Sequence, residues 1–394
     1  MTEALQSLRV VDFTWVLAGP YATRILADFG AQVIKIQSKT VAKDADTNLD
    51  GYFNTWNRNK LGITLNLNKP KGIDIVKKLV YLSDVVVENF SPRVMNNWGL
   101  GYDVLSRDNQ GLIMLSMSGM GHTGIWKDHV AFGPTIQALS GLTKLTGFQG
   151  QPPVGVGYSY ADHVAGLTAA LAVIEALEYR RRTGKGQYID LSELESMAAL
   201  LGVTLLNCNV NQDTCDMVGN RSLSRQAAPH NVYRCAGDDR WCAVCVFTEE
   251  EWQAFCRVIG DPSWIKEERF SNLSNRMEHV DDLDRLVEEW TSMHTAEEVM
   301  TLLQQSGVPA GVVQDAKGLR KDPQLNSRGF YAKAEHPVLG TVLFDGNPIK
   351  LSATPPQFDN PAPLLGQHNE YVYSELLGMS AEEIESYKQE GVFD

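Results

Sequence analysis

The strongest chemical feature of the sequence is one carboxylate at the start of an apolar helical pattern. Asp162 lies in "YSYADHVAGLTAALAVIEAL", residues 158–177, between a glycine-containing run and an apolar stretch with helical spacing. An aspartate in that place can cap the helix by accepting hydrogen bonds from its first free N–H groups. It can also act as a nucleophile, because an ordinary pKa of about 3.9 keeps it ionised at neutral pH without a general base.

Patterns used by other enzyme classes are missing from the sequence. The run "GVGYSY" lacks the third glycine of a dinucleotide fingerprint, no G-x-S-x-G elbow precedes a helix, and the histidines form no i, i+4 pair. Cys242 and Cys245 have zinc-like spacing, but they lie in a β-patterned run where residues three apart face opposite sides. We therefore expect no metal site.

The composition is that of an acidic globular protein. The 394 residues are 43% hydrophobic, which is enough for a large core and two domains. Asp and Glu total 48 against 35 Lys and Arg, so a formal charge of −13 disfavours nucleic acid and anionic membranes. The N-terminus lacks a signal-peptide pattern, and no apolar run approaches the roughly 18 residues of a membrane span. We expect a cytoplasmic enzyme with no nucleic-acid and no membrane partner.

Strand and helix patterns alternate over residues 1–215 and predict a doubly wound, Rossmann-like open parallel sheet in a large ligand-binding domain. The expected strands span residues 8–13, 31–36, 62–67, 84–90, 112–117 and 188–192. The expected helices span residues 19–30, 69–82, 194–207 and a stretch from His163 to about Arg182.

A polar linker ends this alternation, and a smaller α+β domain is expected at residues 225–325. It begins with a hairpin pattern at residues 231–247 and continues with amphipathic helices to about Gln305. Residues 330–394 contain two more strand patterns and a helix near 380–390, and we expect this C-terminal segment to return to the large domain.

Ligands of open α/β sheets bind where strands end and helices begin. The first such junction is "DFTWVLAGPY", residues 12–21, which is short, apolar and ends in Gly19-Pro20. Its backbone from Val16 to Ala18 could approach a phosphate or an adenine.

Seven motifs occur in one order over nearly the whole chain: "LRVVDFTWVLAGPYATRILADFGAQVIKI", "YFNTWNRNKLGITLNLNKPKG", "VVVENFSPRVMNNWGL", "IQALSGL", "YADHVAGLTAALAVIEALEYRRRTGKGQYIDLS", "GVPAGVV" and "APLLGQH". With these motifs the sequence resembles the family III CoA-transferases, which include formyl-CoA, carnitine and benzylsuccinate CoA-transferases and the related α-methylacyl-CoA racemases. The family's catalytic aspartate lies in the pattern G/A-D-x-x-x-G, which is Ala161 to Gly166 here.

The resemblance implies a CoA-transferase in which Asp162 attacks the thioester carbonyl of an acyl-CoA. An acyl-aspartyl anhydride and then an aspartyl-CoA thioester would carry the group to a carboxylic acid acceptor. Coenzyme A is then a substrate, and no permanently bound cofactor is expected. The run "GVGYSY" before Asp162 is expected to supply N–H groups to the oxyanions and to cover the site.

By the same resemblance ten residues are expected to bind CoA: Val16, Leu17, Ala18, Ser38, Leu65, Asn68, Asn89, Arg93, Asn97 and Trp98. Family members often carry basic residues at the positions of Ser38, Asn68 and Asn97, so the charge that binds phosphate must lie elsewhere. The candidates near predicted loops are Arg93, Arg58, Lys60 and Lys39.

A racemase is the nearest alternative within the resemblance, and one position discriminates. Similar racemases place a catalytic His nine residues before the glycine of "LSG", and that position is Phe132 here, with His129 three residues away. Phe132, Trp15 and Tyr158, with Trp126, are expected instead to form a partly aromatic acyl pocket, which favours a dicarboxylic or aromatic acid with succinyl-CoA as the donor.

Assembly is the last expectation from the resemblance. Family members form interlocked, ring-like dimers, so the partner is expected to be a second copy or a paralogous subunit. A non-catalytic scaffold subunit is the alternative from another functional class. Such a subunit would be expected to lack the aspartate, and Asp162 is present.

Overall fold

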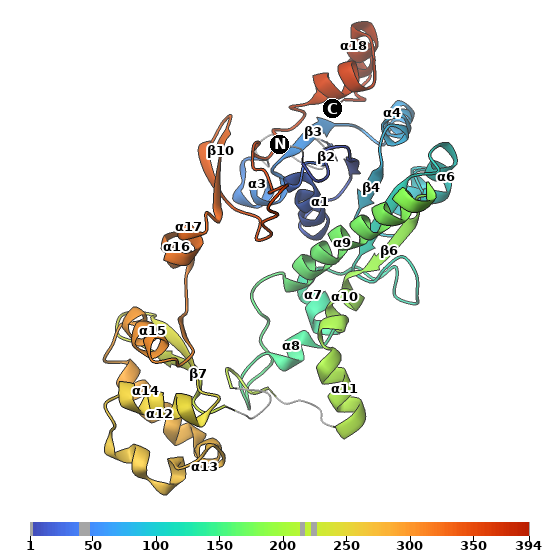
Figure 1. The fold of residues 1–394 in the computed structure, drawn as a ribbon. Coiled ribbons are helices and arrows are strands. Elements are labelled where there is room, and N and C mark those ends of the chain that lie inside the picture. The colour runs from blue at the N-terminus through green and yellow to red at the C-terminus, as the bar shows by residue number, and fades with distance from the viewer. Residues whose placement is uncertain (1–2, 39–47, 213–216, 222–226, 394) are drawn as a thin grey trace. The chain divides into compact units, whose positions relative to one another are not determined.

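The computed structural model describes residues 3–38, 48–212, 217–221 and 227–393 (Figure 1). The chain divides into two compact units. Unit 1 comprises residues 1–143, 155–213 and 326–394, and unit 2 comprises residues 144–154 and 214–325. The candidate site lies within unit 1.

Unit 1 is built on a six-stranded parallel sheet with the order β3-β2-β1-β4-β5-β6. Its strands are β1 (Arg9–Asp12), β2 (Gln32–Gln37), β3 (Lys60–Thr64), β4 (Val85–Glu88), β5 (Ile113–Ser118) and β6 (Tyr188–Ser192). This confirms the predicted open α/β sheet, with β3 starting two residues earlier than its pattern indicated. Because β1 pairs with both β2 and β4, the chain reverses its direction across the sheet at β1, and a crevice opens beyond the ends of β1 and β4.

Helices cover both faces of this sheet (Figure 1). On one face α1 (Ala18–Asp28) and α9 (Tyr160–Thr183) pack on Val10 and its neighbours. On the other face α4 (Pro70–Tyr81), α6 (Tyr102–Asp108) and the end of the chain pack around Val11. Both faces of each central strand are therefore buried, which explains why the strand sequences are apolar runs without alternation.

The remaining elements of unit 1 surround this core. They are α3 (Gly51–Asn57), α5 (Val94–Asn97), α7 (Gly133–Leu139), α8 (Leu142–Leu145), α10 (Glu193–Leu200), α11 (Gly202–Asn211), a hairpin of β10 (Tyr331–His336) and β11 (Gly340–Asp345), a π-helical segment (Tyr371–Leu376) and α18 (Ala381–Gln389). The single helix predicted over 194–207 is thus two helices. Ile136, Ala161 and Met197 join α7, α9 and α10 into one cluster beside the crevice.

Unit 2 has its own core around a three-stranded antiparallel sheet in the order β7-β8-β9. Its elements are β7 (His230–Arg234), β8 (Trp241–Cys245), α12 (Glu249–Val258), two 3-10 turns (Ser263–Lys266 and Glu268–Phe270), α13 (Leu273–Glu278), α14 (Val280–Thr291), α15 (Ala296–Gln305), β9 (Ala310–Val312) and α16 (Ala316–Lys321). A short helix α17 (Pro323–Ser327) runs from unit 2 into unit 1. Cys242 is buried on β8 while Cys245 lies on its other, partly exposed side, as the spacing predicted.

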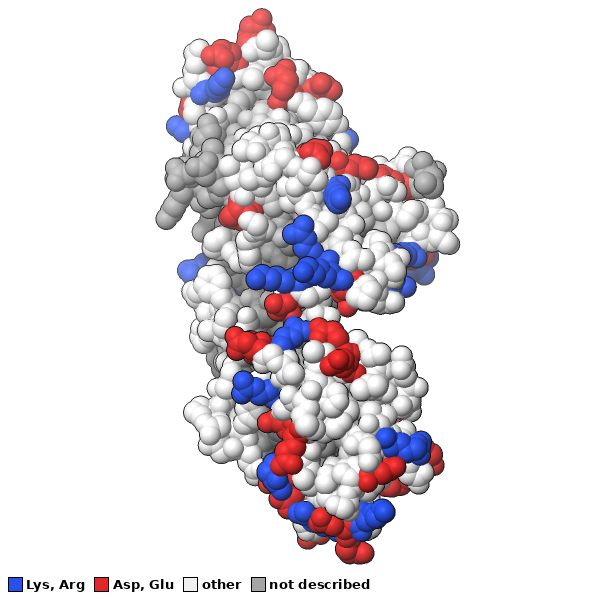
Figure 2. Space-filling model, turned by 90° about the vertical axis from the view of Figure 1, so that its left-hand side faces the viewer, with Lys and Arg blue, Asp and Glu red and all other residues white. Residues whose placement is uncertain are grey.

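Helix α9 corrects one expectation from the sequence. It is long and apolar enough to cross a membrane by length and composition, although 44% of its most apolar window is buried inside unit 1. Its buried residues pack against α1 and the sheet, as those of a core helix do. On the face shown in Figure 2, other residues cover most of the described surface, and acidic and basic side chains occur in small groups of both signs. A cytoplasmic location without a membrane partner stays a prediction.

Candidate active site

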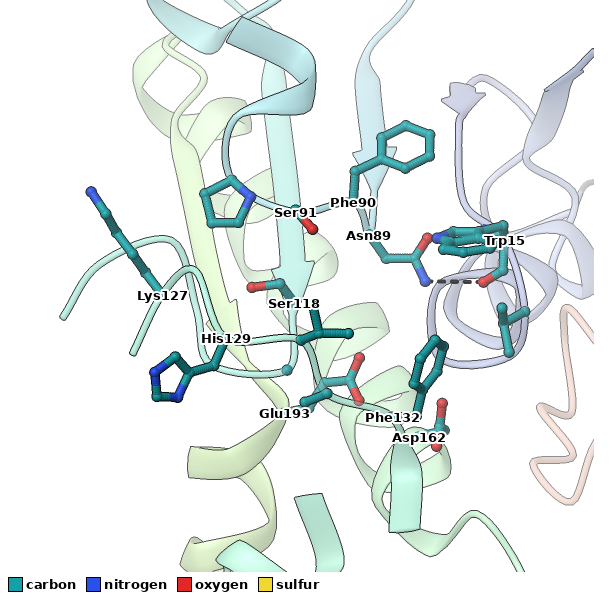
Figure 3. Close-up of a pocket in the computed structure, with 15 residues that line it drawn as sticks. Trp15, Asn89, Phe90, Ser91, Ser118, Lys127, His129, Phe132, Asp162 and Glu193 are labelled. Atoms are coloured by element: carbon teal, nitrogen blue, oxygen red, sulfur yellow. Dashed lines mark hydrogen bonds between the residues drawn. The ribbon is translucent and has the colours of Figure 1, made fainter. Parts of the chain in front are cut away.

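Two loops meet at the crevice, one after β1 and one after β4. The side-chain amide of Asn89 pairs with both backbone groups of Trp15: its Oδ1 accepts from the Trp15 N–H (2.9 Å) and its Nδ2 donates to the Trp15 carbonyl (3.0 Å; Figure 3). Asn89, an expected CoA ligand, therefore fixes the position of the first loop.

The same loop is anchored from beneath by buried charges. Asp12 Oδ1 accepts a hydrogen bond from the Thr14 N–H (2.7 Å), and Lys35 Nζ donates to the Thr14 carbonyl (2.7 Å). Val16 follows with φ of 63°, a left-handed conformation that β-branched residues rarely adopt. Such strain costs about 1–3 kcal/mol and persists only where the surroundings hold it, so the loop has a fixed shape at a functional position.

Asp12 and Lys60 form a fully buried ion pair under this loop. Lys60 Nζ donates to Asp12 Oδ2 (2.9 Å), and further donor bonds go to Thr23 Oγ1 (2.7 Å) and Asn57 Oδ1 (3.0 Å). Burial alone would raise the pKa of Asp12, but attraction to Lys60 and Lys35 lowers it to about 2. Burial lowers the pKa of Lys60 to about 7, against the attraction of Asp12.

Two residues expected to bind phosphate are therefore assigned wrongly. Lys60 is 1% exposed and faces Asp12, and Arg58 is 1% exposed and pairs with Asp28 through Nη2 and Oδ2 (2.7 Å). Both side chains turn inward because each neutralises a buried carboxylate. Arg93 is exposed and its Nε lies 3.5 Å from Asp128 Oδ1, and Lys39 lies outside the described residues.

Helix α9 begins earlier than predicted, and Asp162 is not its cap. Ser159 is the N-cap and Tyr160 the first helical residue, which places Asp162 at the third position of the first turn. The N–H group of Tyr160 donates to Gln137 Oε1 of α7 (2.8 Å) as well as to the Tyr158 carbonyl (2.7 Å), and Ala161 makes a longer bond to Gln137 Oε1 (3.4 Å). Gln137 therefore bonds the N–H groups of the first two helical residues, while the Asp162 carboxyl group accepts from the Ser159 hydroxyl and from its own N–H group.

The Asp162 carboxyl group is buried but only partly bonded. The residue is 8% exposed, and its Oδ2 accepts no hydrogen bond from the described residues. Burial raises its pKa, an effect that the Ser159 hydroxyl and its own backbone N–H oppose. Gly133 makes room for it, because a Cβ atom there would lie 2.4 Å from Asp162 Oδ2.

His163 holds the segment before the helix in place. Its Nδ1–H donates to the Ser159 carbonyl (2.7 Å), so its Nε2 is the acceptor for the Tyr158 hydroxyl (2.8 Å). The two rings stack with centroids 4.5 Å apart. Tyr158, which was expected in the acyl pocket, therefore packs on the start of α9.

Two cavities adjoin this arrangement. The smaller, of about 120 Å³, lies at Asp162 and is lined by Trp15, Val16, Asn89, Phe90, Ser91, Pro92, Ser118, Gly119, Lys127, His129, Val130, Ala131, Phe132, Asp162 and Glu193. We call it the aspartate pocket (Figure 3). The larger, of about 490 Å³, is the apolar pocket, and Trp15, Val16 and Phe90 line both. The strained loop at Val16 is therefore a shared wall of the aspartate pocket and the apolar pocket.

The structure brings most of the predicted site residues to these cavities. The apolar pocket contains Val16, Ser38, Leu65, Asn68 and Trp98, and the aspartate pocket contains Trp15, Asn89, Phe132 and Asp162. The others line neither cavity: Leu17 and Ala18 are buried at the start of α1, Asn97 and Arg93 are exposed on or beside α5, and Trp126 stacks on His129.

Five residues of the site were missed from the sequence: Lys35, Tyr52, Ser118, Gly133 and Glu193. Burial, then the negative charge of Asp162, raises the pKa of Tyr52 to about 12, so its phenol stays a donor. Ser118 ends β5 and Glu193 follows β6. Applying the strand-end rule to every strand would have found these two residues.

The sheet order, the crevice at its reversal and the paired cavities are those of an open α/β enzyme that binds its ligand at the carboxyl edge of the sheet. Comparison with known proteins is more specific. CoA-transferase family III matches residues 5–369. The succinyl-CoA–D-citramalate CoA-transferase of Chloroflexus aurantiacus is 34% identical over 387 residues, 96% of each chain.

Two further relatives cover essentially the whole chain. A formyl-CoA:oxalate CoA-transferase of Rhodopseudomonas palustris is 31% identical over 421 residues, covering 100% of this chain and 98% of the relative. The crystal structure of a CAIB/BAIF family protein from Brucella suis superimposes with a TM-score of 0.88 at 29% identity, covering 95% of this chain and 100% of that one. The chain belongs to CoA-transferase family III, and it is a CoA-transferase whose substrates include CoA thioesters.

Proposed function

We propose that the enzyme moves CoA from an acyl-CoA, with succinyl-CoA as the donor, to a carboxylic acid through covalent intermediates on Asp162. The observation that carries the proposal is the buried Asp162 carboxyl group: its Oδ2 has no hydrogen-bond partner among the described residues, and Asp162 lines a small cavity beside a larger apolar one. A relative that covers nearly the whole chain is named for succinyl-CoA and a dicarboxylic acid, which supports this donor.

The proposed steps conserve the energy of the thioester. An Asp162 oxygen attacks the acyl carbonyl, the C–S bond breaks, CoA leaves as thiolate, and a mixed acyl-aspartyl anhydride remains. The thiolate attacks the aspartyl carbonyl, which releases the donor acid with one oxygen from Asp162 and leaves an aspartyl-CoA thioester. The acceptor carboxylate repeats the sequence in reverse, so that acyl-CoA forms and the Asp162 carboxylate is restored with one oxygen from the acceptor.

The protein's part in this chemistry is confinement and charge placement. We place the apolar portion of CoA in the apolar pocket and the thioester beyond Val16 in the aspartate pocket. Lys35 is the only Lys or Arg among the described residues that line the apolar pocket, and it already bonds to Thr14, so the phosphates extend past this pocket toward the loops. Glycines in the segment 155–160 supply the flexibility to cover the site and present N–H groups.

Covalent trapping tests the proposal. The enzyme is incubated with succinyl-CoA and then with hydroxylamine, and the modified peptide is mapped by mass spectrometry. We expect a hydroxamate on Asp162. Asp162→Ala should give no adduct and no exchange, whereas the exposed Asp74→Ala should behave as the wild type. An adduct on another residue, or full exchange by Asp162→Ala, would refute the mechanism.

Racemisation is the second candidate, because His129 lines the same cavity as Asp162 and could act as a second acid or base. Phe132 occupies the position where similar racemases carry their histidine. Incubating a 2-methylacyl-CoA in deuterium oxide without an acceptor acid separates the two functions. We expect no deuterium at the α-carbon; wash-in that His129→Ala abolishes would establish the racemase.

We further propose that two chains form the interlocked dimer. Apolar side chains stand exposed on α9 and α11 of unit 1, among them Leu171 (56% exposed), Val203 (84%) and Val210 (67%). Covering such side chains with a second copy would remove them from water. Light scattering should give twice the 43.6 kDa chain mass, and a monomer at micromolar concentration would contradict this assembly.

A further inference from the structure

Two polar side chains in the aspartate pocket have no partner of their own. Ser118 is the last residue of β5, and its buried hydroxyl oxygen makes no hydrogen bond to any part of the chain that the structure describes. Glu193 is the first residue of α10, is 7% exposed, and its carboxyl group forms no hydrogen bond or ion pair with the described residues. Both line the pocket with Asp162 (Figure 3), and Ser118 pairs in register with Ser192, the neighbour of Glu193.

Neither residue has an evident structural task. A glutamate in the first turn of a helix normally points into water, where it interacts favourably with the helix dipole. The α10 helix is capped by the Ser192 hydroxyl, which accepts from the Glu195 N–H (3.3 Å), and so does not need Glu193. Burying an unbonded carboxyl group costs free energy, which is recovered if a ligand supplies the missing bond.

The surroundings keep the Glu193 carboxyl group protonated at neutral pH. Burial, and after it the charge of Asp162 on α9, raises its pKa to about 8. Lys127 and His129, from the segment between β5 and α7, also line the pocket but make no ion pair with Glu193. At pH 7 Glu193 is therefore a neutral acid that can donate a hydrogen bond beside the ionised form of Asp162.

We infer that Ser118 and Glu193 form a subsite for a second oxygen-bearing group of the substrate acid, distinct from the carboxyl group that reacts at Asp162. Glu193 donates its acid proton to an oxygen of that group, and the Ser118 hydroxyl makes a second bond. The substrates are then short acids with a distal carboxylate or hydroxyl group rather than plain aliphatic acids. The inference rests on the proposed function, since it places the reacting carboxyl group at Asp162.

The test compares acceptor acids of equal carbon number. With succinyl-CoA as the donor, kcat/KM for butyrate, 3-hydroxybutyrate and isotopically labelled succinate is measured from pH 6 to pH 9 with the wild type, Glu193→Leu, Glu193→Gln and Ser118→Ala. Glu195→Gln is the matched control, because Glu195 lies on the same helix but is exposed. Wild type should prefer an oxygen-bearing acid over butyrate about 10- to 100-fold at pH 7, the range expected when a buried donor is satisfied or left unpaired.

Each variant has a defined expectation. Glu193→Leu should reduce that preference at least about tenfold, and Glu193→Gln, which retains a donor, should keep it within about threefold. Preference for succinate in the wild type should fall as the pH passes the Glu193 pKa of about 8, because the ionised side chain repels a carboxylate. It should stay flat in Glu193→Gln. Preference for 3-hydroxybutyrate should persist, since ionised Glu193 accepts from a hydroxyl group, and this identifies which group binds.

Three results would overturn the subsite: a wild type with no preference over butyrate, a Glu193→Leu variant with the wild-type preference, or a preference that Glu195→Gln loses equally. The hydroxylamine adduct is measured in parallel. Failure of the subsite leaves the Asp162 adduct intact in every variant, whereas failure of the proposed function removes it from the wild type as well.

Discussion

Asp12 and Asp162 are both buried carboxylates at the edge of one parallel sheet, yet their surroundings are opposite. Asp12 is fully buried, bonds to Thr14, Thr23 and Lys60, and has a pKa lowered to about 2. Asp162 is 8% exposed, has one oxygen without a partner among the described residues, and has a raised pKa. Within that same part of the chain, the carboxyl group of Glu193 in the same pocket has no hydrogen-bond partner.

The difference shows how this fold separates structural from catalytic burial. Both carboxyl oxygens of Asp12 and both backbone groups of Thr14 have partners, so this cluster holds the strained loop at Val16. At Asp162 one carboxyl oxygen lacks a partner among the described residues, and the free energy cost of burying it is offset when substrate binds. Substitutions around Asp12 should affect the free energy of unfolding, and substitutions around Asp162 should affect the rate of turnover.

The largest effect is expected at Asp162 itself. Asp162→Asn removes the nucleophile while keeping the shape of the side chain, so CoA exchange should fall by about a thousandfold or more. The free energy of unfolding should stay the same or rise, because an amide costs less to bury than a charge. Exchange kinetics and urea denaturation measure the two quantities; a strong loss of stability would place Asp162 with Asp12 as a structural residue.

Lys60→Met should lower the stability of the protein, in contrast to the Asp162 variant, which should lose activity. It leaves Asp12 charged and unpaired in the core, which costs about 3–5 kcal/mol of unfolding free energy. Lys77→Met, on the exposed side of α4, should stay within about 0.5 kcal/mol of the wild type in the same denaturation experiment. A Lys60→Met protein of normal stability would show that the ion pair is not what holds this part of the fold.

Gly133→Ala should act on turnover through contact with the nucleophile. The new Cβ atom would lie 2.4 Å from Asp162 Oδ2, so the carboxylate must move, and kcat should fall about 10- to 100-fold. The control is Gly202→Ala, whose Cβ would meet no atom within 4 Å. Equal kcat values in both variants would mean that the position of Asp162 is not critical.

The smallest effect concerns Glu88, the last residue of β4. Its Oε2 accepts from the Phe90 N–H (2.8 Å), and burial raises its pKa from 4.5 to about 7. The folded state therefore binds the proton more tightly, so this contribution to stability is full below pH 4.5 and is lost as the pH rises toward 7. Glu88→Gln should reduce the decline in thermal stability over this window by about 1–2 kcal/mol. An identical decline in the wild type and the variant would contradict the assignment.

The sequence predicts what depends on local pattern. The parallel sheet follows from apolar runs such as "LRVVDF" and "LIMLSM" alternating with helical periods, and the Asp162 helix follows from its own spacing. Partners that come from distant segments were not predictable in this way. Lys60 looks like a loop cation until the fold brings it to Asp12, and Gln137 takes over the cap from 23 residues before Tyr160.

Glu193 illustrates the same limit in the site. In the sequence it is an ordinary glutamate in the first turn of a helix. It lines the aspartate pocket only because α10 packs against α7 and α9. The ten residues expected from the resemblance to bind CoA fall into two groups, those that line the cavities and those that do not. Residues on strand-end loops reach the cavities, while Leu17, Ala18, Arg93 and Asn97 do not line them.

The most direct measurement of the central claim follows an oxygen atom. The enzyme turns over succinyl-CoA with an acceptor acid labelled with ¹⁸O in its carboxylate, and the peptide that contains Asp162 is then weighed by mass spectrometry. Transfer through an aspartyl anhydride predicts ¹⁸O in the Asp162 side chain and, after further turnovers, in the released succinate. Complete exchange with no label in Asp162 would contradict the account.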